Sequence, residues 1–455
     1  MPFRLGYCGS VCCAVALLIA VCGCAESPAA QAPPPPLSLT IITPHDAAIR
    51  QAFEAGFSEW HRAKTGRQVV IDWIVRGTPQ CVRYVEGLFE GSAGSNSAGR
   101  PDLMFGGGIN DHAKLAKHGR TYQLDLASAV SAIPEKIHGL PTRDPKGNWY
   151  ATGLSSFGII YNQRRCAQRD IAAPATWTDL ANPAYFGWVA VADPAASGSH
   201  TQAMVIMIEK MGWAKGWSAI IRTLANARAL APSSSVAAQQ VATGYCLAGY
   251  SVNFAGLSLQ ENAEGIKYVN PADATAVTPD VISVLKTSAN KELATRFVEF
   301  CLSDEGQATW GVRPEYRKTV GDTLYHYPID PAVYARYEGK LAVKENPFSR
   351  EFGVSIDLSR SADEAALIAV LVHAATGDNH VLLQRAWRAV IDSGMNPDAL
   401  AELTVSPVDP EEIHAIAEKL RSGDAAQVAR LREDWTRMFE RRYQRVLEIC
   451  GKGAA

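Results

Sequence analysis

Short apolar runs alternate with longer amphipathic segments along the chain up to residue 320. Residues 37–42, 69–75 and 102–105 are apolar runs of strand length, and residues 47–64 place an apolar side chain at every third or fourth position. Strands separated by helices of this kind are typical of a mostly parallel sheet with helices on both faces. The pattern therefore predicts an α/β fold.

One strand-to-helix junction concentrates small polar residues. An apolar run over residues 188–192 ends, and Ser197 and Ser199 then precede a helix predicted over residues 201–211. A helix N-terminus carries unpaired backbone N–H groups and the positive end of the helix dipole, so hydroxyl groups placed there suit an anion or an oxygen-rich ligand. The alternative interpretation is an ordinary serine cap without a ligand.

The same arrangement recurs three more times. The four junctions lie at residues 43–46, 106–110, 197–200 and 233–235. Two precede residue 160 and two follow it, and ligands of open α/β sheets bind beyond the carboxyl ends of the strands. A cleft between two lobes would therefore gather the junctions around a small anionic or polyhydroxylated ligand. The alternative is a purely structural loop, which we expect for at least one of the four.

Hydroxyl, imidazole and backbone N–H groups at these junctions are the expected ligand contacts. Ser197 and Ser199 come first as hydrogen-bond donors, followed by Thr43 and His45. Glycine lets the backbone approach a ligand closely. The predicted ligand-binding residues are Thr43, His45, Gly107, Gly108, Ser156, Ser197, Ser199, Ser234 and Asn253. We predict no catalytic residue, no metal ligand and no cofactor.

The N-terminus has the features of a bacterial export signal. Arg4 precedes an apolar run over residues 11–21 that is too short to span a membrane. The sequence Val-Cys-Gly-Cys at residues 21–24 resembles the lipobox of bacterial lipoproteins, which implies cleavage before Cys24 and lipidation of Cys24. Residues 26–36, with four consecutive prolines, would then form an extended tether. The alternative is a hydrophobic start that is buried or clipped.

Charge and cysteine usage narrow the function classes. The net charge of -2 gives no basic face for nucleic acid. The cysteines that follow the predicted lipidation site form no CxxC pair, so a zinc site is not expected, although one or two disulfides could form in an oxidising compartment. These residues are Cys81, Cys166, Cys246, Cys301 and Cys450.

Several short motifs carry a resemblance to a known family. They are Gly-Asn-Trp-Tyr at residues 147–150, Gly-Ile-Ile-Tyr-Asn at 158–162, Pro-Ala-Thr-Trp-Thr-Asp-Leu-Ala-Asn-Pro at 174–183, Asp-Pro-Ala-Ala-Ser-Gly at 193–198, Ala-Asn-Lys-Glu-Leu-Ala at 289–294 and Phe-Val-Glu-Phe-Cys-Leu-Ser-Asp-Glu-Gly-Gln at 297–307. In this order they resemble the bacterial extracellular solute-binding proteins of ABC importers, in the ferric-ion, phosphonate, sugar-phosphate and polyamine group. The resemblance covers residues 37–315. It implies a type II periplasmic-binding-protein fold, in which two α/β lobes close on a ligand and dock on a membrane permease.

These expectations divide the chain into five parts. They are a signal peptide (1–23), a lipidated cysteine with its tether (24–36), a first, N-terminal lobe (37–157 plus 275–320), a second, C-terminal lobe (158–274) and a helical extension (321–455). The chain should cross between the lobes near residues 156–162 and 271–279. The extension could cover the first lobe, contact a partner or form a separate helical domain.

We therefore expect a monomeric receptor, lipid-anchored in the periplasm or cell envelope, that delivers a small solute to an ABC permease. The resemblance and the junctions together favour phosphate, a phosphonate or a sugar phosphate as the class of solute. Nucleic acid is not an expected partner, and the membrane is one only through the lipid anchor.

The sequence departs from the family where iron would bind. Ferric-binding members carry adjacent tyrosines, whereas residues 251–255 read Ser-Val-Asn-Phe-Ala, and Phe254 cannot ligate iron. Tyr250 and His45 could, so a ferric-ion or ferric-chelate receptor stays an alternative. A polyamine would need carboxylates in the cleft, and the junctions offer only Asp46, Asp111 and Asp193.

Two other function classes stay open. A serine hydrolase could use Ser155, Ser156, Ser197 and His200, but the Gly-x-Ser-x-Gly motif is absent, as is the His-Glu-x-x-His motif of a metalloenzyme. A ligand-sensing lipoprotein without transport would keep the fold and signal through the C-terminal helices. Trp149 and Tyr150 are interpreted as cleft walls or, as is commoner, as core aromatics at the start of a strand.

Overall fold

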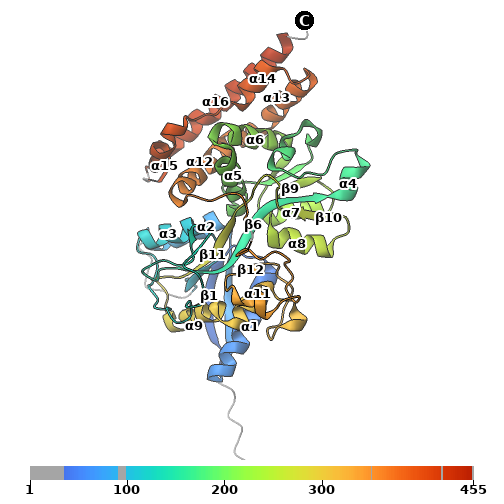
Figure 1. Cartoon of the computed structure of the whole chain (residues 1–455). Coiled ribbons are helices and arrows are strands. Elements are labelled where there is room, and N and C mark those ends of the chain that lie inside the picture. Colours follow the sequence, from blue (N-terminus) through green and yellow to red (C-terminus); the bar gives the residue numbers. More distant parts are fainter. Residues whose placement is uncertain (1–34, 91–98, 350, 422–423, 453–455) are drawn as a thin grey trace, which may run out of the picture. The chain divides into compact units, whose positions relative to one another are not determined.

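The computed structural model describes residues 35–90, 99–349, 351–421 and 424–452, which form a mixed sheet with helices packed around it (Figure 1). The strands of the sheet follow the order β2-β1-β3-β11-β6-β9-β7-β8, and β10 and β12 also pair with β6. This architecture confirms the predicted α/β class. The predicted lipidation site, Cys24, lies outside the described residues.

The strands have the following bounds: β1 (Leu37–Thr43), β2 (Val69–Val75), β3 (Leu103–Phe105), β4 (Lys136–Ile137), β5 (Leu140–Pro141), β6 (Tyr150–Asn162), β7 (Val189–Ala192), β8 (Ala227–Ala231), β9 (Ala248–Val252), β10 (Ile266–Val269), β11 (Val277–Val284) and β12 (Tyr327–Pro328). Strands β1, β2 and β3 are mutually parallel, as are β7, β8 and β9, while β6 and β11 run antiparallel to their neighbours. We call β1, β2, β3 and β11 with their helices the first lobe, and β7 to β10 with theirs the second lobe.

The helices are α1 (Ala47–Thr65), α2 (Thr78–Glu90), α3 (Ile109–Lys117), α4 (Gln163–Gln168), α5 (Gly198–Met211), α6 (Trp213–Asn226), α7 (Ser234–Ala242), α8 (Asn253–Asn262), α9 (Lys291–Leu302), α10 (Asp304–Gly311), α11 (Ala332–Arg336), α12 (Leu358–Thr376), α13 (His380–Asp392), α14 (Pro397–Thr404), α15 (Ile413–Arg421) and α16 (Ala425–Lys452). Helix α1 begins after Asp46, whose carboxylate accepts from the N–H of Ile49, and ends at Gly66 with a φ of 75°. Helix α5 begins three residues before the predicted start because Ser197 caps it.

The chain crosses between the lobes at more than one place. Strand β6 pairs with β11 up to Ser156 and with β9 from Phe157 onward. The chain returns beside this point, where the hydroxyl of Thr275 donates to the carbonyl of Phe157 at 2.5 Å. Further along, Phe352 packs in the core cluster of the first lobe, whereas Ile356 belongs to the larger cluster that contains the second lobe and helices α12 to α16. The domain limits given above stay a prediction.

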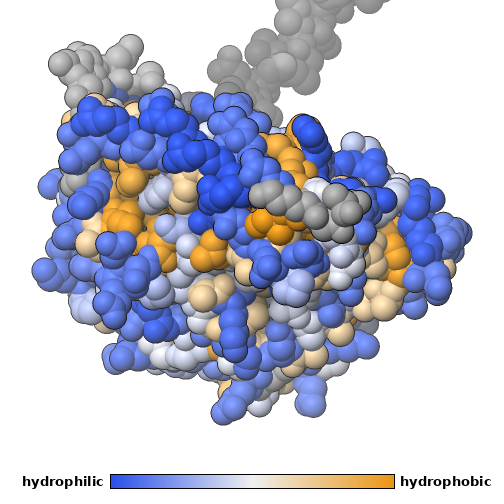
Figure 2. All heavy atoms as spheres, turned by 90° about the horizontal axis from the view of Figure 1, so that it is seen from above, coloured by the Kyte–Doolittle hydropathy of each residue, from blue (hydrophilic) through white to orange (hydrophobic). Residues whose placement is uncertain are grey.

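Helices α12 to α16, which we call the C-terminal layer, share one hydrophobic core with the second lobe. Trp217 stacks on Phe439 with ring centroids 5.9 Å apart, and the indole N–H of Trp387 donates to Asn226 at 2.7 Å. The outer face is mostly hydrophilic, and its hydrophobic side chains form separate patches in the view from above (Figure 2). Such a shared core argues against an independently folded helical extension.

Two further observations concern the described part of the chain. Its helices include none that is by itself long and apolar enough to cross a membrane, and one pair, α12 with α13, meets that test together with a bend of 79°. Cys81, Cys166, Cys246, Cys301 and Cys450 are free thiols in this structure.

Candidate functional site

The start of α5 places two serine hydroxyls at a positive helix end. The Ser197 hydroxyl accepts from the backbone N–H of His200 at 3.4 Å and lies 3.3 Å from the hydroxyl of Ser199. Ser197 is buried and Ser199 is half-buried, and the first turn of α5 contains no acidic residue. The positive end of this helix is therefore not neutralised by a carboxylate of its own first turn.

The start of α2 in the first lobe touches the start of α5 in the second. A Cβ atom added to Gly198 would lie 3.2 Å from the hydroxyl of Thr78, and one added to Gly77 would collide with the carbonyl oxygen of Ala196. The first turn of α2 also lacks an acidic residue. Nothing local in the sequence marked Thr78 as a site residue. Two helix starts without an acidic residue in their own first turns thus meet where the lobes meet.

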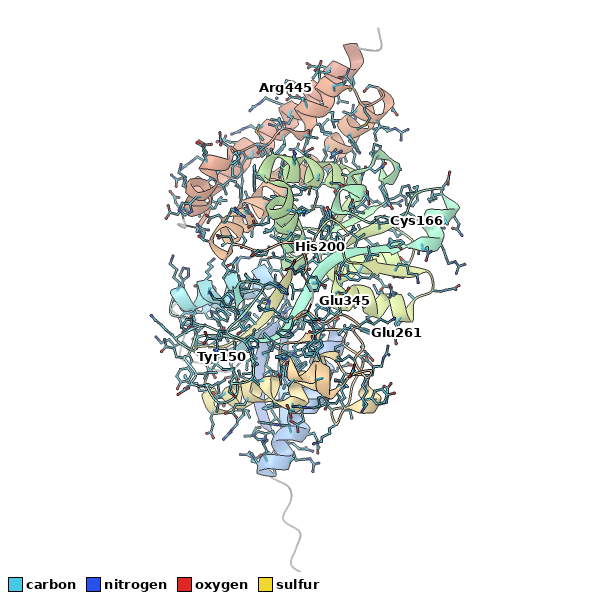
Figure 3. All side chains as sticks on the ribbon, viewed as in Figure 1. Tyr150, Cys166, His200, Glu261, Glu345 and Arg445 are labelled. Carbon is cyan, nitrogen blue, oxygen red and sulfur yellow. The ribbon has the colours of Figure 1, made fainter. Side chains whose placement is uncertain are left out.

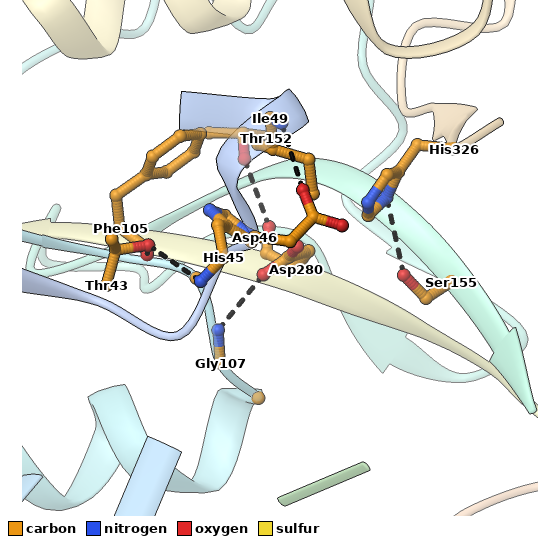
Figure 4. Close-up of polar contacts among 12 residues, drawn as sticks. Thr43, His45, Asp46, Ile49, Phe105, Gly107, Thr152, Ser155, Asp280 and His326 are labelled. Carbon is orange, nitrogen blue, oxygen red and sulfur yellow. Dashed lines mark hydrogen bonds and ion pairs between the residues drawn. The ribbon is translucent and has the colours of Figure 1, made fainter. Parts of the chain in front are cut away.

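The start of α3 lies beside the same contact. A Cβ atom added to Gly107 would approach the Thr78 methyl group to 2.8 Å, and Gly107 has a φ of 104° that favours glycine. The Gly107 N–H donates to Oδ1 of Asp280 at 3.0 Å, and Nε2 of His45 lies 2.9 Å from Oδ2 of the same carboxylate (Figure 4). Thr43 holds this loop, because its hydroxyl accepts from the N–H of His45 at 3.1 Å and donates to Phe105 at 2.6 Å.

Carboxylates already occupy the backbone N–H groups that were expected to meet a ligand at α3. Gly107 donates to Asp280, and Gly108 donates to Oδ2 of Asp111 at 3.2 Å. Burial raises the pKa of Asp111 to about 6. The hydrogen bond from the Gly108 N–H lowers this pKa, but the effect of burial is larger. Burial also acts to raise the pKa of Asp280, but the charge and hydrogen bond of His45, with His326 and the Gly107 N–H, hold it below its usual value. Asp280 was not among the predicted site residues.

An aromatic cluster packs against the His45 and Asp280 pair. The ring of His326 stacks on Phe254 at 4.0 Å between centroids and lies 4.4 Å from Trp310. Burial lowers the pKa of His326 to about 3. Sequence reasoning missed His326 because it follows the segment that carries the family motifs.

Ser156 and Asn253 face the protein interior in this structure. The N–H of Ser156 donates to Oδ1 of Asn253 at 3.0 Å, and its hydroxyl donates to Asn270 at 3.1 Å. The Asn253 amide donates to the carbonyl of Tyr325 at 3.0 Å. Both predicted residues are buried and hold the crossing strand to the chain segments around it. Their assignment to the ligand stays a prediction.

The fourth junction lies beside the α5 start. Ser234 is the first residue of α7 and is half-buried, and Ser233 caps the helix by accepting from the N–H of Val236 at 3.2 Å. The N–H of Asp193 donates to the carbonyl of Ala231 at 3.0 Å, which joins the two second-lobe junctions. Thr43, His45 and Gly107 thus connect through Thr78 to the α5 start, whereas Ser234 belongs to the second-lobe side alone.

Ser197 and His200, two of the side chains considered for a serine hydrolase, are not arranged as a catalytic pair. The Ser197 hydroxyl accepts from the backbone N–H of His200, and the His200 ring accepts from the N–H of Ala192 at 2.8 Å. His200 is labelled in Figure 3. Burial lowers the pKa of His200 to about 3. Trp149 and Tyr150 are buried core aromatics, and the Tyr150 hydroxyl donates to Leu124 at 2.7 Å.

The alternative metal ligands are also placed in the structure. The Tyr250 hydroxyl is buried and donates to the sulfur of Met207 at 3.4 Å, so it does not face His45. Within the described ranges, no three or more His, Cys, Asp or Glu side chains are grouped so as to hold a metal ion.

The central part of the chain matches a family model, and parts of the chain match curated proteins. Residues 101–312 match the model of a family described as bacterial extracellular solute-binding protein. The phosphoglycerate transport regulatory protein PgtC of Salmonella typhimurium is 28% identical over 200 residues, which cover 44% of this chain and 47% of PgtC. Iron uptake protein A1 of Synechocystis is 27% identical over 211 residues, which cover 43% of this chain and 53% of that protein. The chain therefore spans about half the length of the curated relatives it matches.

Solved structures share the fold. The periplasmic binding protein AfuA of Actinobacillus pleuropneumoniae with bound fructose-6-phosphate has a TM-score of 0.54 at 20% identity, covering 71% of this chain and 96% of AfuA. Iron-bound HitA of Pseudomonas aeruginosa has a TM-score of 0.53 at 19% identity, covering 73% of this chain and 98% of HitA. The two-lobed periplasmic-binding-protein fold is thereby confirmed. Residues 101–312 are thus similar to the bacterial extracellular solute-binding family.

Proposed function

We propose that this solute-binding protein is a lipid-anchored receptor outside the cytoplasmic membrane that closes on a small phosphorylated or similarly anionic solute and delivers it to an ABC permease. The observation that carries the proposal is the contact between Thr78 at the start of α2 and Gly198 at the start of α5, from opposite lobes. Neither helix has an acidic residue in its first turn.

Electrostatics explains why an anion fits there. Each helix start carries about half a positive charge, and two such ends in contact repel each other. A phosphate or carboxylate group between them would turn this repulsion into attraction and would accept hydrogen bonds from Ser197, Ser199 and Thr78. The neighbouring His45 and Asp280 pair offers both donor and acceptor atoms for the hydroxyl groups of an organic solute.

The names of similar proteins support a phosphate-bearing solute. PgtC is named for phosphoglycerate transport, and AfuA was solved with fructose-6-phosphate. HitA and iron uptake protein A1 are named for iron. The iron alternative is weaker for this chain because residue 254 is phenylalanine and the Tyr250 hydroxyl is buried against Met207.

A second candidate function is ligand sensing without transport. The specific observation in its favour is the C-terminal layer, which shares a core with the second lobe. PgtC is also described as a transport regulatory protein. A sensor would expose this layer to a protein partner, whereas an importer subunit would need only the two lobes.

A panel of ligands tests the class of solute. The panel contains phosphate, 3-phosphoglycerate, a hexose phosphate, a phosphonate, ferric citrate, putrescine and thiamine, and thermal unfolding is measured with each. A ligand at a hundred times its dissociation constant stabilises the fold by roughly 2.7 kcal/mol. We expect stabilisation by the phosphate-bearing compounds. Stabilisation by ferric citrate alone would contradict the proposal.

A pair of variants locates the site. Ser197→Ala combined with Ser199→Ala should weaken binding of the stabilising compound roughly tenfold, because two hydroxyl donors are lost while the backbone N–H groups remain. Ser233→Ala is the matched control, since it removes a serine cap from α7 on the same lobe. Equal affinity of the double variant and the wild type would exclude the α5 start as the site. Release of the protein from membranes by Cys24→Ala tests the lipid anchor separately.

A further inference from the structure

The first two turns of α12 contact three different parts of the molecule. Nε of Arg360 donates to Glu209 of α5 in the second lobe at 3.2 Å. The hydroxyl of Ser361 accepts from the side-chain amide of Asn110, which belongs to α3 of the first lobe, at 3.3 Å. Asp363 accepts from the ring of His414 on α15 at 2.6 Å. One short stretch of helix therefore touches both lobes and the C-terminal layer.

These attachments differ in what happens when the lobes separate. Helix α12 is anchored to the second lobe because its apolar residues, among them Leu367 and Leu371, lie in the second-lobe core. Asn110 lies in α3 of the first lobe, two residues after Gly108 and three residues after Gly107. It is therefore expected to move with the first lobe. The bond between Asn110 and Ser361 must therefore change when the lobes open, while the bond to Glu209 need not.

The turn around Ser361 contains buried carboxyl groups that tie it to its neighbours. Glu364 is 3% exposed, and its Oε1 lies 3.7 Å from Nε of Arg360, which also pairs with Glu209. Asp363 is 6% exposed and shares its carboxylate between His414 and Arg421. Removing a partner from a buried charge is costly, so a displacement of this turn is expected to reach α15 rather than to be absorbed locally.

We infer that the first two turns of α12 couple closure of the lobes to the ordering of α15 in the C-terminal layer. The inference rests on the proposed function, because it needs lobes that open and close. This coupling would give the C-terminal layer a role beyond ligand binding, for which the two lobes alone would suffice. The position of α15 would report whether the cleft is closed, and a partner that contacts α15 could respond to that state.

A reversible disulfide that holds the two lobes together tests the effect of closure in the absence of a ligand. Thr78→Cys with Gly198→Cys places two Cβ atoms about as close as a disulfide needs, since the Cβ added to Gly198 lies 3.2 Å from that of Thr78. The lock is made in the full chain with Cys450→Ser, because Cys450 is the partly exposed thiol of the free cysteines. Amide hydrogen exchange is then compared between the oxidised and the reduced protein.

The expected result is a change at two places. Reduction should speed exchange at the starts of α2 and α5, which reports opening, and should speed exchange in α15 about fivefold, the effect of losing one ordinary hydrogen bond from a local opening equilibrium. Asn110→Ala in the oxidised protein should raise α15 exchange to the reduced level. Asn262→Ala is the matched control, because that amide bonds only within its own helix as far as the described contacts show.

The outcomes distinguish the inference from the proposed function. Faster exchange at α2 and α5 without a change in α15 would overturn the coupling and leave the receptor function intact. An unaltered α15 in the oxidised Asn110→Ala protein would overturn the coupling in the same way. No change at α2 and α5 on reduction would show that the lobes do not separate, and both proposals would fall together.

Discussion

The two lobes treat their helix starts differently. In the first lobe, Asp46 caps α1, and Asp111 accepts the Gly108 N–H at the start of α3. In the second lobe, Ser197 caps α5 and Ser233 caps α7. A carboxylate neutralises the positive end of a helix and uses its N–H groups, whereas a serine caps the helix without adding charge.

This difference indicates which helix starts can receive the negative charge of a ligand. The α3 start already holds two carboxylates, so a third anion there would meet repulsion. The α5 start holds none in its first turn and faces the α2 start, whose first turn also lacks an acidic residue. We infer that the second lobe and α2 receive the charged group of the solute, and that the α1 and α3 starts shape the cleft around its uncharged part.

The largest effect is expected when the serine cap of α5 is replaced by an aspartate, the residue that caps α1 in the first lobe. Ser197→Asp should weaken binding of a phosphate-bearing ligand by at least about 100-fold, because the new carboxylate repels the anion and occupies its donors. Aspartate is as good a cap as serine, so the free energy of unfolding should change little. Calorimetric titration with thermal unfolding measures both quantities.

Its control uses the other serine-capped helix. Ser233→Asp places the same charge at α7, which does not take part in the contact with α2. A binding loss of the same size in Ser233→Asp would mean that net charge, not the α5 start, controls affinity.

The next largest effect concerns the carboxylate shared by His45 and Gly107. Asp280→Asn should lower the free energy of unfolding by about 2 kcal/mol at neutral pH, because it removes a largely buried carboxylate that accepts from the Gly107 N–H and contacts the His45 ring. The lowered pKa of Asp280 means that its contribution is present above the ordinary value of 3.8 and disappears as the pH falls through the folded-state pKa. The two proteins should therefore converge in acid. Asp193→Asn, which changes only a turn cap, should match the wild type throughout.

A smaller effect with the opposite sign is expected at the α3 start. The raised pKa of Asp111, about 6 against 3.8, means that the folded state disfavours the ionised form, so stability is lost as the pH rises from about 4 to about 6. Asp111→Asn keeps an acceptor for the Gly108 N–H without the charge. It should stabilise the protein by about 1 kcal/mol near pH 8 and by nothing near pH 4, as measured by chemical denaturation. A variant less stable than the wild type near pH 8 would show that the charge at α3 is favourable.

The parts of the site that sequence could predict are those made by neighbouring residues. Caps join side chains and N–H groups three positions apart, as for Ser197 with His200 and Asp46 with Ile49. The alternation of strands and helices was equally local, and the α/β class was predicted correctly. Strands β8 and β10 were missed because their short sequences carry no clear alternation.

The parts that sequence could not predict depend on distant pairing. His45 and Asp280 are 235 positions apart, and Ser156 and Asn253 are 97 apart. A polar side chain at a cleft can face a ligand or another segment, and the choice is decided by tertiary contacts. One signal was available for Asp280, because a lone carboxylate inside the apolar run of β11 needs a buried partner.

The smallest effect is expected when an exposed carboxylate, that of Asp46, is removed. Asp46 is exposed and caps α1 in the lobe where Asp111 and Asp280 are held against the cleft. Asp46→Ser should change the free energy of unfolding by less than about 0.5 kcal/mol, because both residues cap well. It should change affinity for a phosphate-bearing ligand less than about threefold, because solvent and salt screen an exposed charge. Titration at low and high salt checks this, and a gain above tenfold at low salt would mean that the first-lobe helix starts also govern the charge of the solute.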